Sequence, residues 1–438
     1  MKRIAWLLLL LNLLRPSDPI PAPPQDHPIL LDNGIIHTVT NGTLYGGDLL
    51  FDRGRIVRIE LEIQPTPEME VIDVTGKHIY PGLIAADSPL GLVEINAVRA
   101  TRDFAEVGSV NPNVIANVSY NTDSELIPVT RSNGVLYVNV TPQSGLVSGQ
   151  SSLMKLDAWT WEEATEASPT GLHIHWPRMT IRTEGKEKKP VEEQEKQRRE
   201  AIRKLDDLFA EARAYQRLQQ HASRKDQPLR DVKLESLLPY VSGEKPVFVH
   251  ANEVRQIAAA LDWARRQGVK MVLVGGHDAW RLADALQAAD VPIIYENVLA
   301  LPLRRYEDTD QAYATPGLLV RAGCTVAIAA SSSPFEAAHQ RNLPYHAGLA
   351  AAFGLDPEEA LRSITLRPAQ ILGVADRLGS LEAGKLASLF IADGDILEPS
   401  SRVEAAWIEG RKLDLRDRHK LLYAKYREKY RQLGILPR

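Results

Sequence analysis

Residues 71–90, VIDVTGKHIYPGLIAADSPL, separate two kinds of sequence pattern. From the N-terminal side up to Val74, short apolar or alternating runs are separated by Gly, Asn and Asp, and Val71 to Val74 is the last of them. This pattern predicts a small β-sheet. After Ile79, apolar strand-like runs alternate with longer amphipathic segments such as Val254 to Gln267. Strands about 20 to 30 residues apart with helices between them are typical of βαβ units and a parallel sheet.

The composition is that of a globular chain with a large core. The 438 residues include 56 acidic and 52 basic side chains, so the net charge of −4 predicts no nucleic-acid partner and no acidic tail. Hydrophobic residues make up 44% and charged residues 25%, which excludes disorder, collagen and a multi-span membrane protein. Cys324 is the single cysteine, so a disulfide framework, a cysteine zinc cluster and a redox pair are excluded.

The N-terminal segment indicates export. Lys2 and Arg3 precede an apolar run from Ile4 to Leu14, and a Pro-rich stretch follows at residues 16–24. Such a run is too short to span ~30 Å of hydrocarbon as a helix, and it has the form of a secretory signal. We therefore expect a periplasmic or extracellular protein that meets the membrane only through this signal. An uncleaved anchor is the alternative, since a small-x-small cleavage pattern is missing.

Two segments predict charged helices. Between Glu184 and Asp231 the chain is rich in Lys, Glu, Arg and Gln, with apolar residues such as Leu205 and Phe209 at helical spacing. We expect a long helix packed on the outside of the body, because charges of mixed sign favour a solvated face over nucleic-acid binding. Arg416 to Leu433 is also rich in charged residues with apolar residues at helical spacing, and we expect this helix to hold the C-terminus against the body.

Residues 71–90 resemble the start of the barrel in the amidohydrolase superfamily, which has the form V-I-D-x-x-G-K-x-x-x-P-G-L-I-D-x-H-x-H. Residues 363–373, SITLRPAQILG, and 379–389, GSLEAGKLASL, are similar to the T-x-N-P-A-x-x-L-G and G-S-L-x-x-G-K-x-A-D-L patterns near the end of that family. These matches bracket residues 30–412 in the right order. Within the superfamily the chain is most similar to the imidazolonepropionase-like branch.

The resemblance implies an α/β fold: a (β/α)8 TIM-type barrel with a small composite β-sandwich domain formed by the N- and C-terminal segments. The expected division is a signal and linker at 1–25, the first part of the β domain at 26–78, the barrel at 79–375 with a charged helical excursion at about 184–240, the second part of the β domain at 376–413, and a C-terminal helix at 414–438.

The resemblance also implies a divalent metal, whose expected ligand positions are only partly kept. The two histidines of the family's first strand correspond to Asp87 and Pro89, and the aspartate before them to Ala85. A carboxylate oxygen remains available at the first position, whereas proline has no donor atom. The fifth-strand and sixth-strand histidines correspond to His250 and His277.

The family's eighth-strand aspartate, both ligand and general base, is replaced. Alignment on Pro334 puts it at Ser332, within one residue, and a hydroxyl of ordinary pKa cannot replace a carboxylate as a base. Asp87 and Ser332 are therefore the candidate catalytic residues. Asp87, His250 and His277 reach the three protein ligands that catalytic zinc usually has.

A second pair of histidines has the spacing that the first strand has lost. His173 and His175 lie at i and i+2 in the strand-like run Gly171 to Pro177, so both rings share a face. On spacing alone they are speculative metal ligands, because the family places none on this strand. The alternative is that they pack under the charged helix or hydrogen-bond to backbone.

Two hypotheses for function stay open. The first is an exported hydrolase of carbon–nitrogen bonds that acts on a small amide, cyclic imide or dipeptide-like substrate with one divalent metal, Zn, Mn or Fe, at an altered mononuclear site. The second is a catalytically inactive binding or scaffold protein with a degenerate, metal-free site, as one half of a homo- or hetero-oligomer with an active homologue. Neither hypothesis involves another cofactor.

Overall fold

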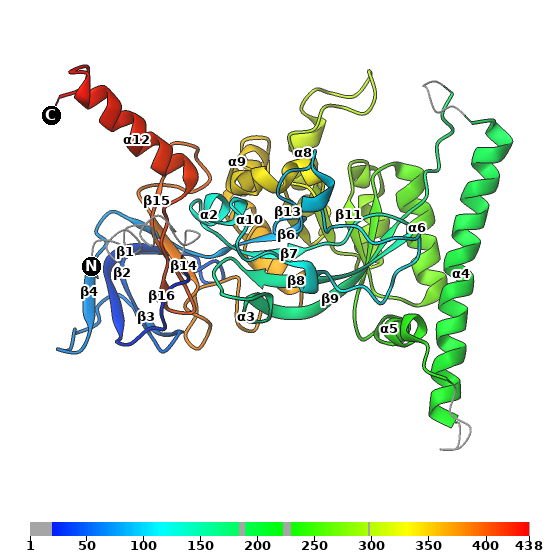
Figure 1. Ribbon diagram of the computed structural model, residues 1–438, viewed down its shortest axis with the longest axis horizontal. Coiled ribbons are helices and arrows are strands. Elements are labelled where there is room, and N and C mark those ends of the chain that lie inside the picture. The colour runs from blue at the N-terminus through cyan, green and yellow to red at the C-terminus, as the bar shows by residue number, and fades with distance from the viewer. Residues whose placement is uncertain (1–19, 184–188, 222–228, 297, 438) are drawn as a thin grey trace, which may run out of the picture.

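The computed structural model describes residues 20–183, 189–221, 229–296 and 298–437. The predicted signal, residues 2–14, lies outside the described residues. Two eight-stranded sheets organise the chain, one assembled from both ends of the sequence and one that forms the barrel (Figure 1). Among the described helices, none combines the length and the apolar character that crossing a bilayer requires.

The first of these sheets has the strand order β16-β15-β14-β5-β1-β2-β3, with β4 on the side of β1. It joins the two ends of the chain where β5 pairs antiparallel with β14, Tyr80 opposite Phe390. Its apolar face encloses a core that includes Phe51 and Trp407, whose rings meet edge to face at 5.7 Å. The strands are β1 Ile29–His37, β2 Thr43–Asp52, β3 Arg55–Glu60, β4 Glu70–Asp73, β5 His78–Pro81, β14 Leu389–Ala392, β15 Val403–Ile408 and β16 Arg411–Lys412.

The barrel sheet runs in the order β13-β12-β11-β10-β9-β8-β7-β6, with β13 packed beside β6 so that the sheet nearly closes. Neighbouring strands are parallel except β8, which is antiparallel to both β7 and β9. The turn between β7 and β8 is too short for the crossover that parallel strands need, so β8 returns as a hairpin. The strands are β6 Leu83–Ser88, β7 Val135–Val140, β8 Val147–Lys155, β9 Thr165–His175, β10 Val247–Ala251, β11 Met271–Gly275, β12 Ile293–Glu296 and β13 Val326–Ala329.

Helices cover the outside of this sheet (Figure 1). The α-helices are α2 Leu126–Arg131, α3 Trp161–Ala164, α4 Val191–His221, α5 Val232–Val241, α6 Val254–Gln267, α7 Ala283–Ala288, α8 Gln311–Arg321, α9 Leu343–Ala352, α10 Pro357–Ser363, α11 Leu366–Ile371 and α12 Arg418–Gln432. Short 3-10 helices are η1 Arg99–Thr101, η2 Ala116–Ser119, η3 Ala279–Leu282 and η4 Pro334–Asn342.

The charged segment holds α4, which lies outside α6. A single buried stripe of α4 that includes Phe209 faces the body, and the Phe209 ring meets the Trp263 ring of α6 edge to face at 5.1 Å. α6 begins at a reciprocal capping box between Glu253 and Gln256, and it ends at Gly268, whose φ of 64° is left-handed. These contacts anchor the long helix although most of its side chains face solvent.

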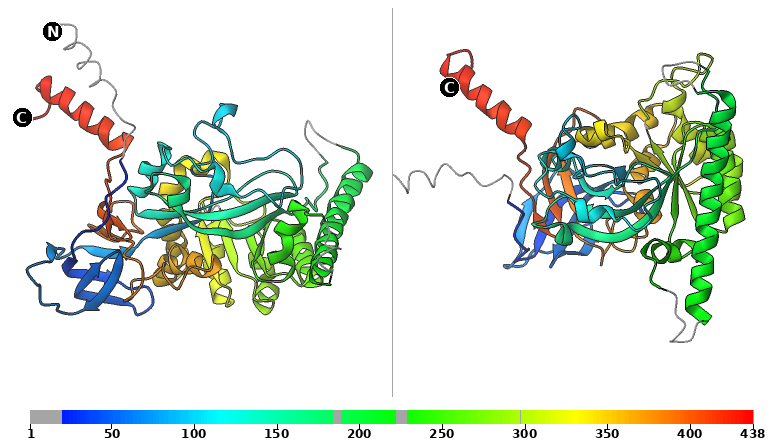
Figure 2. Two further views of the ribbon diagram at one scale, coloured as in Figure 1. Left: turned by 60° about the horizontal axis from the view of Figure 1, so that its bottom comes forward. Right: turned by 45° about the vertical axis from the view of Figure 1, so that its right-hand side comes forward.

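The prediction that the last helix holds the C-terminus against the body is wrong. No side chain of α12 is buried, and the helix projects away from both sheets (Figures 1 and 2). Its cap explains where it starts, because the buried Asp417 carboxylate accepts hydrogen bonds from the backbone N–H groups of His419 and Lys420. Beyond this cap the helix approaches α2, and this contact buries none of its side chains.

Candidate metal centre

Three side chains from three barrel strands converge at the carboxyl ends of those strands. Asp87 comes from β6, His250 from β10 and Glu296 from the last position of β12, and one ligand atom of each lies within 4.8 Å of the other two. The parallel strands β6, β10 and β12 end on the same face of the barrel, which brings these residues together. The arrangement supplies two oxygen donors and one nitrogen donor.

Asp87 is fully buried, and neither of its carboxylate oxygens has a hydrogen bond of good geometry among the described residues. Burial raises the pKa of Asp87 well above its ordinary value, and the negative charge of Glu296 raises it further. The nearby hydroxyls of Thr141 and Ser332 offset only part of this effect. Without a cation, the carboxyl group of Asp87 therefore favours its protonated form.

Glu296 is the second buried carboxyl group of the pair. Burial raises its pKa too, but the backbone N–H of Ser332 donates a hydrogen bond of 2.6 Å to its Oε1 atom and lowers the pKa in part. Two adjacent buried carboxyl groups, one of them without satisfied oxygens, fit a divalent cation that would replace the shared proton. Oxygen and imidazole donors together suit zinc, manganese or iron.

A row of histidines lies beside this group on the inner face of the barrel. β9 and β10 pair in parallel with His175 opposite His250, and His173 on the same face is opposite Phe248. His173 Nδ1 is 2.8 Å from His250 Nε2, and the His175 ring stacks on the His250 ring at 4.3 Å.

All three imidazoles are held neutral. Burial, then the neighbouring histidines, lower the pKa of His250 well below its ordinary value, and burial followed by His175 does the same for His173. Burial lowers the pKa of His175 to about 4. A neutral ring keeps a lone pair, as a metal ligand must.

The structure brings together part of the residue set expected from the sequence. Asp87 and His250 are in the ligand group, and Ser332 touches it through its backbone. His173 and His175 contact His250 but lie outside the group, and so does His277, which is buried with no partner for Nε2 among the described residues.

Sequence reasoning missed Glu296. The signal that could have found it is a lone carboxylate at the carboxyl end of an otherwise apolar strand, Ile293–Glu296, because that end of a barrel strand is where functional residues lie.

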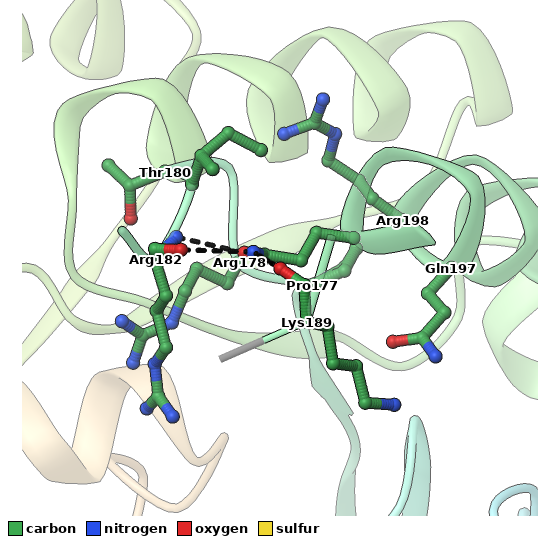
Figure 3. Close-up of a pocket in the computed structure, with 9 residues that line it drawn as sticks. Pro177, Arg178, Thr180, Arg182, Lys189, Gln197 and Arg198 are labelled. Carbon is green, nitrogen blue, oxygen red and sulfur yellow. Dashed lines mark hydrogen bonds between the residues drawn. The ribbon is translucent and has the colours of Figure 1, made fainter. Parts of the chain in front are cut away.

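A basic cavity lies just beyond the end of β9. Its volume is about 580 Å³, and its walls carry the cations Arg178, Arg182, Lys189 and Arg198 (Figure 3). Gln194 fixes the wall by accepting a hydrogen bond from the Arg182 backbone N–H and donating to the Arg182 carbonyl. The barrel is close, because Pro177 in the same wall follows His175 by two residues and the Trp176 N–H donates to the His250 carbonyl. Four cations suit an anionic group.

The fold therefore combines a barrel, a candidate ligand group at the carboxyl ends of its strands and a second sheet built from both chain ends. Residues 312–413 match the model of the amidohydrolase family. The structure superposes on an amidohydrolase from Thermotoga maritima MSB8 with a TM-score of 0.78 and 26% identity, covering 89% of this chain and 100% of that one.

Curated relatives match shorter segments. The imidazolonepropionase of Thermoplasma volcanium is 28% identical over 34% of this chain and 34% of its own length. That of Syntrophobacter fumaroxidans is 36% identical over 22% of each. This chain thus spans about a third or less of the length of these two imidazolonepropionases. The barrel, the family match over residues 312–413 and these similarities support the amidohydrolase superfamily, and within it the imidazolonepropionase-like branch, as the relatives of this chain.

Proposed function

We propose that this chain is an exported hydrolase that cleaves a carbon–nitrogen bond of a small amide, cyclic imide or dipeptide-like substrate at a mononuclear metal centre. The observation that carries the proposal is the convergence of Asp87, His250 and Glu296 within 4.8 Å at the carboxyl ends of the barrel strands. When bound there, a divalent cation supplies Lewis-acid polarisation of a carbonyl group and lowers the pKa of water toward neutrality.

In the family, the eighth-strand aspartate is the general base, and in this chain Ser332 stands at that position. Glu296 supplies a carboxylate in its place. The Ser332 backbone N–H donates directly to Glu296 Oε1, so the glutamate of β12 reaches the place beside the eighth-strand position where the resemblance expects an aspartate. We assign Glu296 as the group that accepts a proton from the attacking water, because this hydrogen bond orients its carboxylate beside the candidate metal position.

His173 is a positioning residue for His250. With the proton of their shared hydrogen bond on His250 Nε2, the other nitrogen of His250 keeps its lone pair for a cation. The buried His173 ring also stacks on Phe248 at 4.8 Å, which fixes its orientation.

The basic cavity supports an acidic substituent on the substrate, such as the free carboxylate of a dipeptide-like compound.

The second candidate, an inactive binding or scaffold protein, is favoured by Pro89 at the position of the second first-strand histidine. One experiment separates the two. The full chain and its His250→Ala, Glu296→Gln and His339→Ala variants are loaded with zinc, manganese or iron, dialysed and analysed by plasma mass spectrometry. His339, an exposed histidine beside Glu336, is the control.

We expect about one equivalent of metal in the parent and the control and under a tenth in the other two variants, because three protein ligands are the usual minimum. Hydrolysis of amides, cyclic imides or dipeptides, measured as released amine or ammonia, should be seen only in the proteins that retain the metal. Metal without turnover of any of these classes supports the scaffold function. Background metal in the parent with every ion rejects metal-dependent hydrolysis.

A further inference from the structure

The C-terminal helix α12 approaches α2 but buries none of its side chains in the described body. Every residue from Arg418 to Tyr430 is exposed, and the apolar side chains include Leu422 at 42% and Tyr423 at 67% exposure. Helices of about 15 residues are only marginally stable in water on their own, and in proteins they gain most of their stability by packing an apolar face. α12 therefore has an apolar face that the rest of the described chain leaves uncovered.

The side chains of α12 are sorted around its axis. At 100° per residue, Leu422, Tyr423, Tyr426 and Tyr430 fall on one arc about 100° wide, which also holds His419, whereas Leu421 lies on the opposite side. Cations border this arc on both sides, namely Arg418, Lys425 and Lys429 along one edge and Lys420, Arg427 and Arg431 along the other. An aromatic and aliphatic face bordered by Lys and Arg is the pattern of helices that lie in the interface of a membrane.

The charge of α12 is opposite to that of the rest of the chain. Residues 418–432 contain six Lys and Arg side chains and one Glu, so their net charge is +5, against −4 for the whole chain and hence −9 for the remainder. An anionic surface attracts this positive helix and repels the negative body, so it orients the protein with α12 toward the surface. Basic residues next to a membrane gain about 1 kcal/mol each from anionic lipid headgroups.

The base of the helix also lies near the first described residues of the chain. The Ala22 backbone N–H donates to Asp157 Oδ2 at 2.9 Å, and Arg411 donates to both the Ala22 carbonyl and Asp157. Arg411 precedes the start of α12 by seven residues, and Figure 2 shows the first described residues beside the base of the helix.

From these observations we infer that α12 binds the anionic phospholipid surface of a membrane, with its tyrosine and leucine face at the headgroups and its two rows of cations on the phosphates. This surface contact is separate from the expected export signal and from the metal centre. It holds the body beside the membrane, whether or not the apolar segment is cleaved.

The test is co-sedimentation of the full chain with lipid vesicles. Phosphatidylcholine vesicles measure any insertion of the N-terminal apolar run, and vesicles with about 30% phosphatidylglycerol add the anionic surface. We expect at least about tenfold stronger partitioning onto the anionic vesicles at about 0.1 M NaCl, and loss of this difference at about 0.5 M, where screening shortens the range of the attraction.

The variant Lys425→Glu/Lys429→Glu reverses two exposed cations one helical turn apart and should lose about tenfold in anionic partitioning. Its matched control, Lys196→Glu/Arg199→Glu, makes the same charge change on the exposed face of α4 and should stay within about twofold of the parent. Leu422→Ser/Tyr426→Ser should also weaken binding, at both salt concentrations. α12 buries no side chain, so all these variants should melt like the parent.

Equal partitioning by the parent and the Lys425→Glu/Lys429→Glu variant would overturn the inference, and so would a parent that does not discriminate between the two lipids. Sedimentation equilibrium supplies another route to rejection. A parent dimer that the same variant dissociates would assign the face of α12 to a second copy of the chain.

Discussion

Replacing Asp87 by asparagine should stabilise the metal-free protein at neutral pH. If both were ionised, Asp87 and Glu296, no more than 4.8 Å apart, would repel by about 3 kcal/mol or more at an effective dielectric constant of ~20, so the folded metal-free chain must instead hold a proton at this pair at a similar cost at neutral pH. Asparagine at position 87 cannot ionise, so it removes this free-energy cost while keeping the shape of the side chain. The unfolding entropy of a chain of this length converts about 0.9 kcal/mol of stability into one degree of melting temperature, so the melting temperature should rise by about 3 °C.

The gain should depend on pH in one direction. A raised folded-state pKa means that the folded chain binds the Asp87 proton more tightly than the unfolded chain does. This contribution to stability is complete below the ordinary carboxyl pKa and is lost as the pH rises toward the raised value. The advantage of Asp87→Asn should therefore be largest at about pH 7.5 and vanish near pH 4.

Thermal unfolding with and without chelator measures both effects. Asp123→Asn, at an exposed carboxylate, is the control and should change the melting temperature little at any pH. Added zinc or manganese should stabilise the parent and fail to stabilise Asp87→Asn. An Asp87→Asn variant that is less stable than the metal-free parent at pH 7.5 would refute the assignment of a destabilising carboxyl pair.

Other substitutions test neighbouring parts of the account. Asp157→Ala should lower the free energy of unfolding by about 3 kcal/mol or more in urea titrations, because it leaves the buried Arg131 guanidinium, 2.7 Å away, without its partner. His173→Phe should weaken metal binding about 10- to 100-fold in competition with a chromophoric chelator, since it removes the hydrogen bond to His250. Saturating metal at about 100 times its Kd should add about 2.7 kcal/mol of stability to the parent, and unchanged melting on chelation would argue against a bound cation.

The fold was within reach of the sequence because its signals are local. The turn-rich β pattern before Val74, the alternation of strands and helices after Ile79, and the two family-like ends at 71–90 and 363–389 all concern neighbouring residues. The reversal of β8 was not predicted, since two successive apolar strands do not reveal whether the second turns back as a hairpin or follows a crossover.

The site was harder to predict because it depends on how strands from distant parts of the chain align. Asp87 and His250 were found because family motifs surround them. Glu296 ends a short buried strand with no motif, and only the pairing of β12 with β13 brings it to Ser332. His277 matches its motif, yet the structure leaves it outside the ligand group.

The projection of α12 was also missed. Its Leu and Tyr spacing predicts an apolar face correctly, but spacing does not say whether the body or another surface covers that face.

The central claim, that Glu296 completes a metal centre with Asp87 and His250, is tested most directly by anomalous diffraction from crystals of the zinc-loaded protein at the zinc absorption edge. The account predicts a single strong peak among the Asp87, His250 and Glu296 side chains, and loss of that peak in Glu296→Gln crystals. A peak that His277, His173 or His175 ligates without Glu296, or no peak at all in the barrel, would contradict it.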